Sequence, residues 1–185
     1  MLQRIGKCQK CELHRNQSPL LDKVTCADIM FVGLSAKFVQ SENEVPLDRN
    51  TKSGDIIAQL EKIAEDYGYT VYRTNLVKCV PLDANGKIRY PNTTEMATCL
   101  DNFFLEYEYI QSKIVVLLGG QVQKAFENYF NRKFEKSTNC KFVFQKVDKY
   151  VFVLGYHPSY ILRNKSKMNL YLDNFESMLR EYKGE

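Results

Sequence analysis

Residues 113–130, "KIVVLLGGQVQKAFENYF", decide the fold. They begin with a short apolar run, rich in β-branched residues, that ends in two glycines, which is typical of a buried strand. The ten residues that follow, 121–130, have a helical pattern. A buried strand followed at once by a helix is the repeating unit of α/β proteins with parallel sheets.

The same unit recurs on both sides of this stretch. Three further apolar runs predict buried strands, at residues 28–33, 70–77 and 150–156. The remaining helical patterns lie at residues 53–68, 92–111 and 167–185. This alternation predicts an α/β fold, a three-layer α/β/α sandwich with a central, mostly parallel four-stranded sheet. The stretch "CKFVFQKV" predicts an extra strand that pairs as a hairpin with the last of the four.

The composition is typical of a globular protein. With 185 residues, 44% of them hydrophobic and 26% charged, we expect a single domain over residues 1–185. No apolar run is long enough to span a membrane, and the start of the chain lacks the apolar core of a secretory signal. We therefore expect a cytoplasmic protein without a membrane partner. The net charge of +4 is compatible with a polyanionic partner but does not identify one.

Six cysteines in a reducing compartment are not expected to form a disulfide framework. Cys8 and Cys11 form a C-x-x-C pair, and Cys79 and Cys99 lie far from it in sequence. Four thiolates can hold zinc in a tetrahedral set or bind an iron-sulfur cluster. The spacing leaves a second interpretation open, in which Cys79 and Cys99 are ordinary buried residues and the N-terminal pair is a redox pair or a mobile end.

Ligand sites of parallel α/β sheets form outside the carboxyl ends of the strands, where several loops converge. The loops that follow the four predicted strands are residues 33–54, 78–92, 119–121 and 156–164. The last of them contains His157, one of only two histidines in the chain. We therefore expect the spatial neighbours of His157 to come from the other three loops.

Several stretches together carry a family resemblance. They are "CQKCELHR" at the start, "RTNLVKCVP" at the second strand, "IVVLLGG" at the third and "HPSYILRN" after the fourth. In order and approximate spacing the chain resembles the uracil-DNA glycosylase superfamily, specifically the iron-sulfur-containing family 4, over nearly its whole length. The resemblance implies that Cys8, Cys11, Cys79 and Cys99 ligate a chiefly structural [4Fe-4S] cluster near the DNA-binding face. Zinc is the alternative cofactor.

The resemblance also implies DNA-repair chemistry. A target nucleotide is flipped into a pocket and its N-glycosidic bond breaks through an oxocarbenium-like state. Asn75 matches the asparagine whose amide both donates to and accepts from the uracil edge. His157 matches the histidine that hydrogen-bonds the base O2 and stabilises the developing anion. From the residues alone, Asn75 can also be a strand-end cap, and His157 a loop histidine satisfied by backbone groups.

The segment after this histidine matches the family's DNA-contacting loop. It supplies a hydroxyl for a phosphate, side chains that wedge into DNA and grip its backbone, and the start of a basic stripe. These candidate contacts are Ser159, Tyr160, Leu162, Arg163 and Lys165. The stripe alone can also be a solvated face. We expect DNA, single- or double-stranded, as the partner.

The first catalytic loop departs from the family, which reads G-E-x-P-G with a later Pro-Phe pair. Leu34 occupies the position of the glutamate, Lys37 that of the second glycine and Leu47 that of the stacking phenylalanine. Leucine cannot polarise water or stabilise a cation, and such a loss lowers rates by about a hundred- to ten-thousand-fold. The expected base pocket consists of Gly33, Leu34, Lys37, Leu47, Asn75 and His157.

These departures leave two functions. We predict a DNA-binding, uracil-DNA glycosylase-like iron-sulfur protein in which ordinary uracil excision is weak or lost. The alternative is an active glycosylase, excising uracil or another modified base, in which Glu42, Glu44 or Asp48 replaces the missing acid. A third hypothesis, a zinc-stabilised module without a nucleic-acid role, is disfavoured by "TNLVKCVP" and "HPSYILRN" occurring together.

Overall fold

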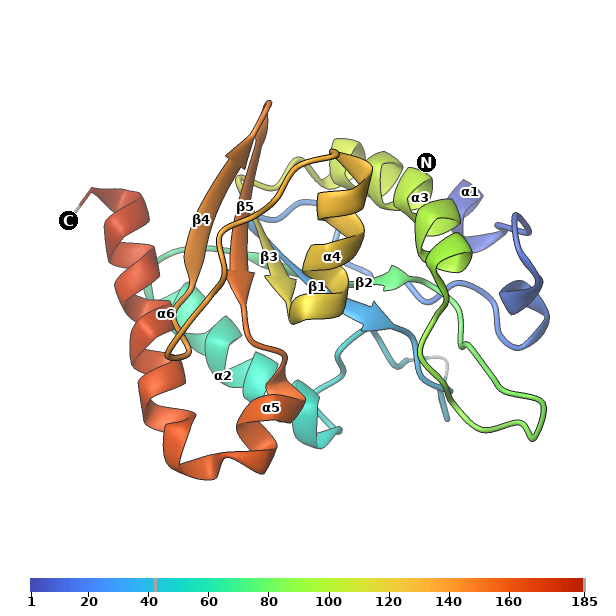
Figure 1. The fold of residues 1–185 in the computed structure, drawn as a ribbon, viewed down its shortest axis with the longest axis horizontal. Coiled ribbons are helices and arrows are strands. Elements are labelled where there is room, and N and C mark those ends of the chain that lie inside the picture. The colour runs from blue at the N-terminus through green and yellow to red at the C-terminus, as the bar shows by residue number, and fades with distance from the viewer. Residues whose placement is uncertain (42, 185) are drawn as a thin grey trace.

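The computed structural model describes residues 1–41 and 43–184 (Figure 1). Within these residues the centre is a five-stranded sheet in the order β2-β1-β3-β5-β4. The strands are β1 (Ile29–Ser35), β2 (Val71–Val77), β3 (Ile114–Leu118), β4 (Val143–Val147) and β5 (Tyr150–Gly155). All neighbours pair in parallel except β4, which is antiparallel to β5.

This sheet confirms the predicted α/β class and its mostly parallel order. The four predicted strands correspond to β1, β2, β3 and β5. The extra strand expected in "CKFVFQKV" is β4, which forms a hairpin with β5 and extends the same sheet. In the described part of the chain the sheet therefore has five strands, whereas a central sheet of four strands was expected.

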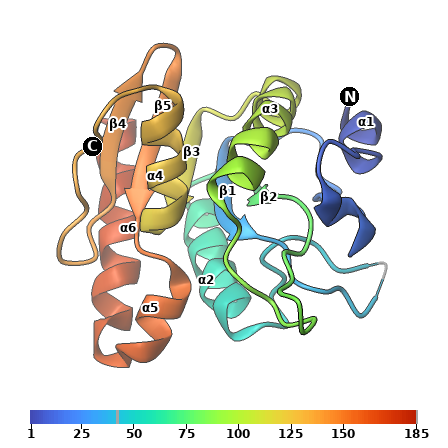
Figure 2. The ribbon, with the colours of Figure 1, turned by 45° about the vertical axis from the view of Figure 1, so that its right-hand side comes forward.

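Helices cover both faces of the sheet (Figures 1 and 2). One face packs against α2 (Lys52–Asp66), α5 (Pro158–Arg163) and α6 (Met168–Lys183). The other packs against α3 (Thr93–Ile110) and α4 (Gly120–Tyr129). None of the helices in the described residues is long and apolar enough to cross a membrane.

Strand β1 shows why the apolar runs are continuous. Ile29 and Phe31 belong to the core on the α2 and α6 face, whereas Met30 and Val32 belong to the core on the α3 and α4 face. All four side chains are fully buried. Since successive side chains of a strand point to opposite faces, a strand covered on both faces must be apolar at every position.

The N-terminal residues form α1 (Leu2–Gly6) and the 3₁₀ helix η1 (Glu12–Arg15). Helix α1 lies beside α3, with Ile5 fully buried (Figure 2). Leu13 of η1 packs into the core on the α3 and α4 face. The chain start is thereby attached to the edge of the molecule next to β2 and α3.

The segment after β5 was expected as a loop, but it forms helix α5 followed by the 3₁₀ turn η2 (Lys165–Lys167). Pro158 occupies the first helical position, where its missing N–H costs nothing. Helix α5 contacts α2 and α6, and this contact fixes the orientation of the residues that follow β5.

The parallel strands bring their carboxyl ends to one edge of the sheet. Gly33 of β1 is paired in register with Asn75 of β2. On the other side of β1, Leu118 of β3 is paired with Gly155 of β5, two residues before His157. The expected convergence of the strand-end loops is therefore built by the strand register itself.

Candidate functional site at the strand ends

Asn75 lies at the centre of this edge. Its side chain is 4% exposed and lies against Gly33 of the neighbouring strand. A Cβ added to Gly33 would collide with the Asn75 amide oxygen and would lie 2.9 Å from Cδ2 of Leu47. Glycine at this position therefore makes room for Asn75 from one side and Leu47 from the other.

A cavity of about 430 Å³ opens in front of Asn75. This volume is within the range of small-molecule sites in proteins. Lys37 and Leu47 also line it, as the sequence predicted for the base pocket. The other lining residues are Leu20, Ser35, Phe38, Val39, Gln40, Glu44, Val45, Asp48, Asn50 and Thr51.

Three predicted pocket residues, Gly33, Leu34 and His157, are not among the residues that line this cavity. Leu34 packs against the core on the α3 and α4 face, because it follows Gly33 and points to the opposite face of β1. His157 is next to the turn after β3 and is not a lining residue of this cavity. There a Cβ added to Gly119 would lie 2.8 Å from Cβ of His157, so this glycine allows the close approach.

His157 is the N-cap residue of α5. Its Nδ1 accepts a hydrogen bond from the backbone N–H of Ser159 at 3.0 Å and lies 2.8 Å from Oγ of the same serine. Burial lowers the pKa of His157, and the positive charges of Lys37 and Arg163 lower it further. The imidazole is therefore neutral at pH 7, with its proton on Nε2, which is left as a hydrogen-bond donor.

A second hollow, of about 560 Å³, lies between the start of α2 and the end of α5. Arg49 and Lys52 line one side, and Leu162, Arg163 and Lys165 line the other. Asp55 is the acidic residue among its lining residues. We call this hollow the basic groove. Three of the predicted DNA contacts therefore lie together in it.

Tyr160 and Ser159 lie outside the basic groove. The Tyr160 ring stacks on Tyr156, with centroids 4.7 Å apart, and its hydroxyl accepts a hydrogen bond from Lys167 at 3.0 Å. Ser159 is bound to the His157 ring. The structure thus places Tyr160 and Ser159 in contacts within the protein, and Arg163 and Lys165 in solvent.

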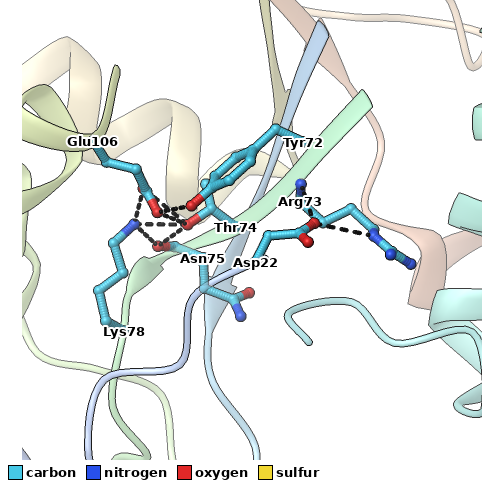
Figure 3. A network of polar contacts seen from close by, with 7 residues as sticks. All are labelled: Asp22, Tyr72, Arg73, Thr74, Asn75, Lys78 and Glu106. Carbon is cyan, nitrogen blue, oxygen red and sulfur yellow. Dashed lines mark hydrogen bonds and ion pairs between the residues drawn. The ribbon is translucent and has the colours of Figure 1, made fainter. Parts of the chain in front are cut away.

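A buried charged network lies behind Asn75 (Figure 3). The Lys78 ammonium donates to the backbone oxygen of Asn75 at 2.7 Å, to Thr74 Oγ1 at 2.7 Å and to Glu106 at 2.5 Å. Tyr72 donates to the other Glu106 oxygen at 2.8 Å. The side chains of Lys78 and Glu106 are 1% and 0% exposed. In Figure 3 the Asn75 side chain points away from this network.

Neither this network nor the pair Arg49 and Lys52 was predicted from the sequence. Lys78 and Glu106 are 28 residues apart in sequence, and each stands next to apolar or aromatic residues. Arg49 and Lys52 carry a weak signal, because "DRNTK" brings two cations to the beginning of a helix whose loop belongs to the expected site.

Comparison with known families identifies the chain. Residues 21–182 match the model of the uracil DNA glycosylase superfamily. The chain belongs to the uracil DNA glycosylase superfamily. No curated protein matches it at a significant level. The family match agrees with the α/β fold and its mostly parallel sheet.

The cysteine pair of the N-terminal segment lies outside the residues matched to the superfamily. The structure nevertheless brings it to Cys79 and Cys99. Burial, with the neighbouring thiols of Cys99, Cys11 and Cys8, raises the pKa of Cys79 to about 12. Burial raises the pKa of Cys99 as well, with further contributions from Cys11 and Cys8, although the Lys78 backbone N–H donates to the Cys99 sulfur and opposes the shift.

Four thiols from the chain start, the end of β2 and α3 are thus close enough to influence one another. Within the described residues, no group of three or more His, Cys, Asp or Glu side chains is arranged to hold a metal ion. The four thiols are soft donors of one kind, which is the ligand chemistry of zinc and iron-sulfur sites, although the structure does not arrange them as a metal-binding set. Asn102 adds an amide N–H that donates to the Cys8 sulfur at 3.1 Å.

The acids that were candidates to replace the family's glutamate differ in position. Glu42 lies outside the described residues. Glu44 and Asp48 both line the cavity with Asn75. Glu44 accepts a hydrogen bond from the backbone N–H of Gln40 at 2.8 Å, and Asp48 Oδ1 accepts one from Asn50 at 2.9 Å. Each carboxylate therefore retains one oxygen for which no hydrogen bond is formed within the described residues.

Proposed function

We propose that this protein binds DNA and takes an extruded uracil-type base into the cavity beside Asn75, with ordinary uracil excision weak or lost. The observation that carries the proposal is the placement of the Asn75 amide, which is nearly buried, lies against Gly33 and lines the cavity. An amide in that position can donate to one edge atom of uracil and accept from another, a pattern that cytosine does not match.

His157 would complete the recognition. Because its Nδ1 accepts the Ser159 N–H, the neutral ring donates only from Nε2. A neutral donor can hydrogen-bond a carbonyl oxygen of the base and stabilise negative charge that grows on it. Lys37 and Arg163 favour this neutral state through their positive charges. His157 thus acts here as a hydrogen-bond donor.

Two side chains support weak excision. Leu34 carries no charge and packs into the core, so it cannot stabilise the sugar cation or orient water. Lys37 places a positive charge at the cavity, where it opposes the positive charge that develops on the sugar. Both effects lower the rate of bond cleavage and leave base recognition intact.

The basic groove would hold the DNA backbone. Within the described residues, Lys52, Arg163 and Lys165 form no ion pair with a carboxylate, and Arg49 approaches Glu61 only to 3.8 Å. Cations without protein partners are available to replace the counterions of phosphate groups. This surface suits either single- or double-stranded DNA, since phosphate contacts do not depend on base pairing.

We propose further that Cys8, Cys11, Cys79 and Cys99 hold a [4Fe-4S] cluster of the family 4 type. When bound, such a cluster ties the chain start to β2 and α3 and supplies no step of the base chemistry. Anaerobic purification followed by iron analysis and visible absorption tests this. We expect a brown protein, with colour lost in Cys99→Ser and kept in Cys26→Ser, whose cysteine is exposed and lies outside the set. A colourless protein containing zinc would favour the alternative cofactor.

The main test measures abasic sites in a uracil-containing oligonucleotide, single- and double-stranded, at enzyme excess. We expect slow or undetectable cleavage by the natural chain, together with tighter binding of uracil DNA than of thymine DNA. Asn75→Ala should remove that preference. If the natural chain shows no preference for uracil, and no DNA affinity that falls with salt, the proposal is wrong.

The second candidate function is active base excision, and Asp48 favours it. Asp48 lines the same cavity as Asn75 and has a carboxylate oxygen available. Under this candidate the natural chain releases uracil or another modified base, and Asp48→Asn lowers the rate about a hundred-fold or more. Slow cleavage that is unchanged in Asp48→Asn would exclude this residue as the substitute acid.

A further inference from the structure

Phe38 differs from every other phenylalanine of the chain. Its side chain is 47% exposed, and none of the other ten phenylalanines in the described residues is exposed. Each of those ten also has another aromatic ring within contact distance. Phe38 has no such ring neighbour among the described residues. Burial and aromatic packing therefore do not explain this side chain.

The position of Phe38 gives it a different role. It lines the cavity in front of Asn75 and follows Lys37 in the loop after β1. The backbone on both sides of it is fixed by one side chain. Gln17 donates to the carbonyl of Lys37 at 3.2 Å and accepts from the N–H of Val39 at 2.9 Å. These two hydrogen bonds hold the backbone on both sides of Phe38, and so fix where this residue projects from the loop beside the cavity.

Leu47 does not provide an equivalent surface. Its side chain packs over Gly33, and its backbone has φ of 54°, in the left-handed region that leucine rarely adopts. A branched aliphatic side chain there closes one wall of the cavity but offers no flat face. Among the residues that line the cavity, Phe38 is the aromatic one.

We propose that Phe38 supplies the stacking face for the base that Asn75 reads. It would do so in place of the phenylalanine that the family resemblance leads one to expect at position 47. The ligand class is a planar pyrimidine of the uracil type, because a single ring stacks on Phe38 while its edge meets the amide. This inference rests on the proposed function, namely that the cavity accepts an extruded base. Stacking of a base on an aromatic side chain strengthens binding by roughly five- to a hundred-fold.

The chain contains no tryptophan, which makes a direct test possible. Phe38→Trp introduces a single tryptophan into this chain. Its fluorescence should be quenched on titration with a single-stranded oligonucleotide containing one uracil. It should change little with the same oligonucleotide carrying thymine. Equal responses to both oligonucleotides would mean that the ring does not meet the base, and would overturn the inference.

Removal of the ring gives the quantitative test. Phe38→Ala should weaken binding of the uracil oligonucleotide roughly five- to a hundred-fold, whereas Phe38→Tyr should bind like the natural chain. Because Phe38 is exposed, neither variant should change the thermal unfolding midpoint appreciably. Tyr109→Ala is the matched control, since Tyr109 is 42% exposed and lies near the end of α3, at the opposite edge of the sheet.

The outcomes separate this inference from the proposed function. If Asn75→Ala removes the preference for uracil and Phe38→Ala does not weaken it, the proposed function stands and the stacking role of Phe38 is wrong. If the natural chain has no preference for uracil, both are wrong. If both substitutions reduce the preference and Tyr109→Ala does not, both are supported.

Discussion

The two sides of the cavity are built in opposite ways. We call Tyr72, Thr74, Asn75, Lys78 and Glu106 the β2 side, and the described residues of the loop between β1 and α2 the loop side. The β2 side is buried, and its charged groups are paired with one another. The loop side carries Lys37 and Phe38 in solvent, and of the two hydrogen bonds of Gln17 that fix it, one is exposed and the other only partly buried.

This difference predicts how the two sides of the cavity tolerate substitution. A change on the β2 side leaves a buried charge or carbonyl without a partner, which costs several kcal/mol. A change on the loop side alters exposed side chains and costs little stability. The β2 side therefore fixes the backbone that carries Asn75, whereas the exposed side chains of the loop side can change at little cost in stability.

The largest effect that separates the two sides is expected from Lys78→Met. The substitution leaves the Glu106 carboxylate buried without its cation, which destabilises the fold by about 3–5 kcal/mol. The matched loop-side change, Lys37→Met, should alter the free energy of unfolding by less than about 0.5 kcal/mol. Urea unfolding of both variants measures the difference.

A double variant tests the cause. In Lys78→Met with Glu106→Leu, the unpaired charge is removed together with its partner, so a substantial part of the stability should return. Full recovery is not expected, since Tyr72 and Thr74 lose their acceptor and the Asn75 carbonyl loses its donor. If the double variant is as unstable as the single one, packing and not charge dominates the β2 side.

The second prediction concerns the basic groove, which joins the loop side to α5. Replacing Arg49 and Lys52 by glutamine should reduce DNA affinity at low salt about tenfold. It should also make the slope of the logarithm of the DNA association constant against the logarithm of the salt concentration less steep, by as much as about 2. Replacing Arg163 and Lys165 should have a similar effect.

The matched control is Lys146→Gln with Lys149→Gln. Lys146 is in β4 and Lys149 precedes β5, which places the pair at the turn of the hairpin and away from the basic groove. Fluorescence anisotropy at several salt concentrations distinguishes the three variants. An equal loss in the control would show that net charge, and not the groove, determines affinity.

Part of this comparison was predictable from the sequence. The strands follow from apolar runs that are buried on both faces, and β4 from the alternating pattern before β5. The family resemblance indicated Asn75 and His157 but not what holds them.

The Lys78–Glu106 pair was missed because a long-range ion pair leaves no periodic pattern in the sequence. A lysine beside a strand end is also usually exposed to solvent. Helix α5 was missed because six residues are too few to show helical periodicity.

The third prediction uses the lowered pKa of His157. In the folded chain this pKa lies below the unfolded value of about 6.5. As the pH falls below about 6.5, the unfolded state binds a proton that the folded state does not, so stability decreases until the folded pKa is reached. The slope attributable to this residue cannot exceed about 1.4 kcal/mol per pH unit.

Urea unfolding between pH 8 and 5 of the natural chain and of His157→Gln measures this contribution. The natural chain should lose more stability over the acidic part of the range than the variant does. His14 is present in both proteins, so its titration does not enter the difference. Parallel curves for the two proteins would show that the folded and unfolded pKa values of His157 are the same.

The smallest expected effect links the loop side to the histidine directly. Lys37→Gln removes one of the two charges that lower the pKa of His157, so this pKa should rise toward its ordinary value while remaining below it, because burial is the larger cause. A pH titration of the imidazole resonances by NMR measures the change. The control is Lys23→Gln, because Lys23 is exposed and is not among the groups that shift the pKa of His157. An unchanged pKa in Lys37→Gln would mean that the charge of Lys37 does not reach His157. A raised pKa would mean that this loop-side lysine helps to keep the histidine neutral, so that the exposed side of the cavity acts on a group at the strand ends through its charge.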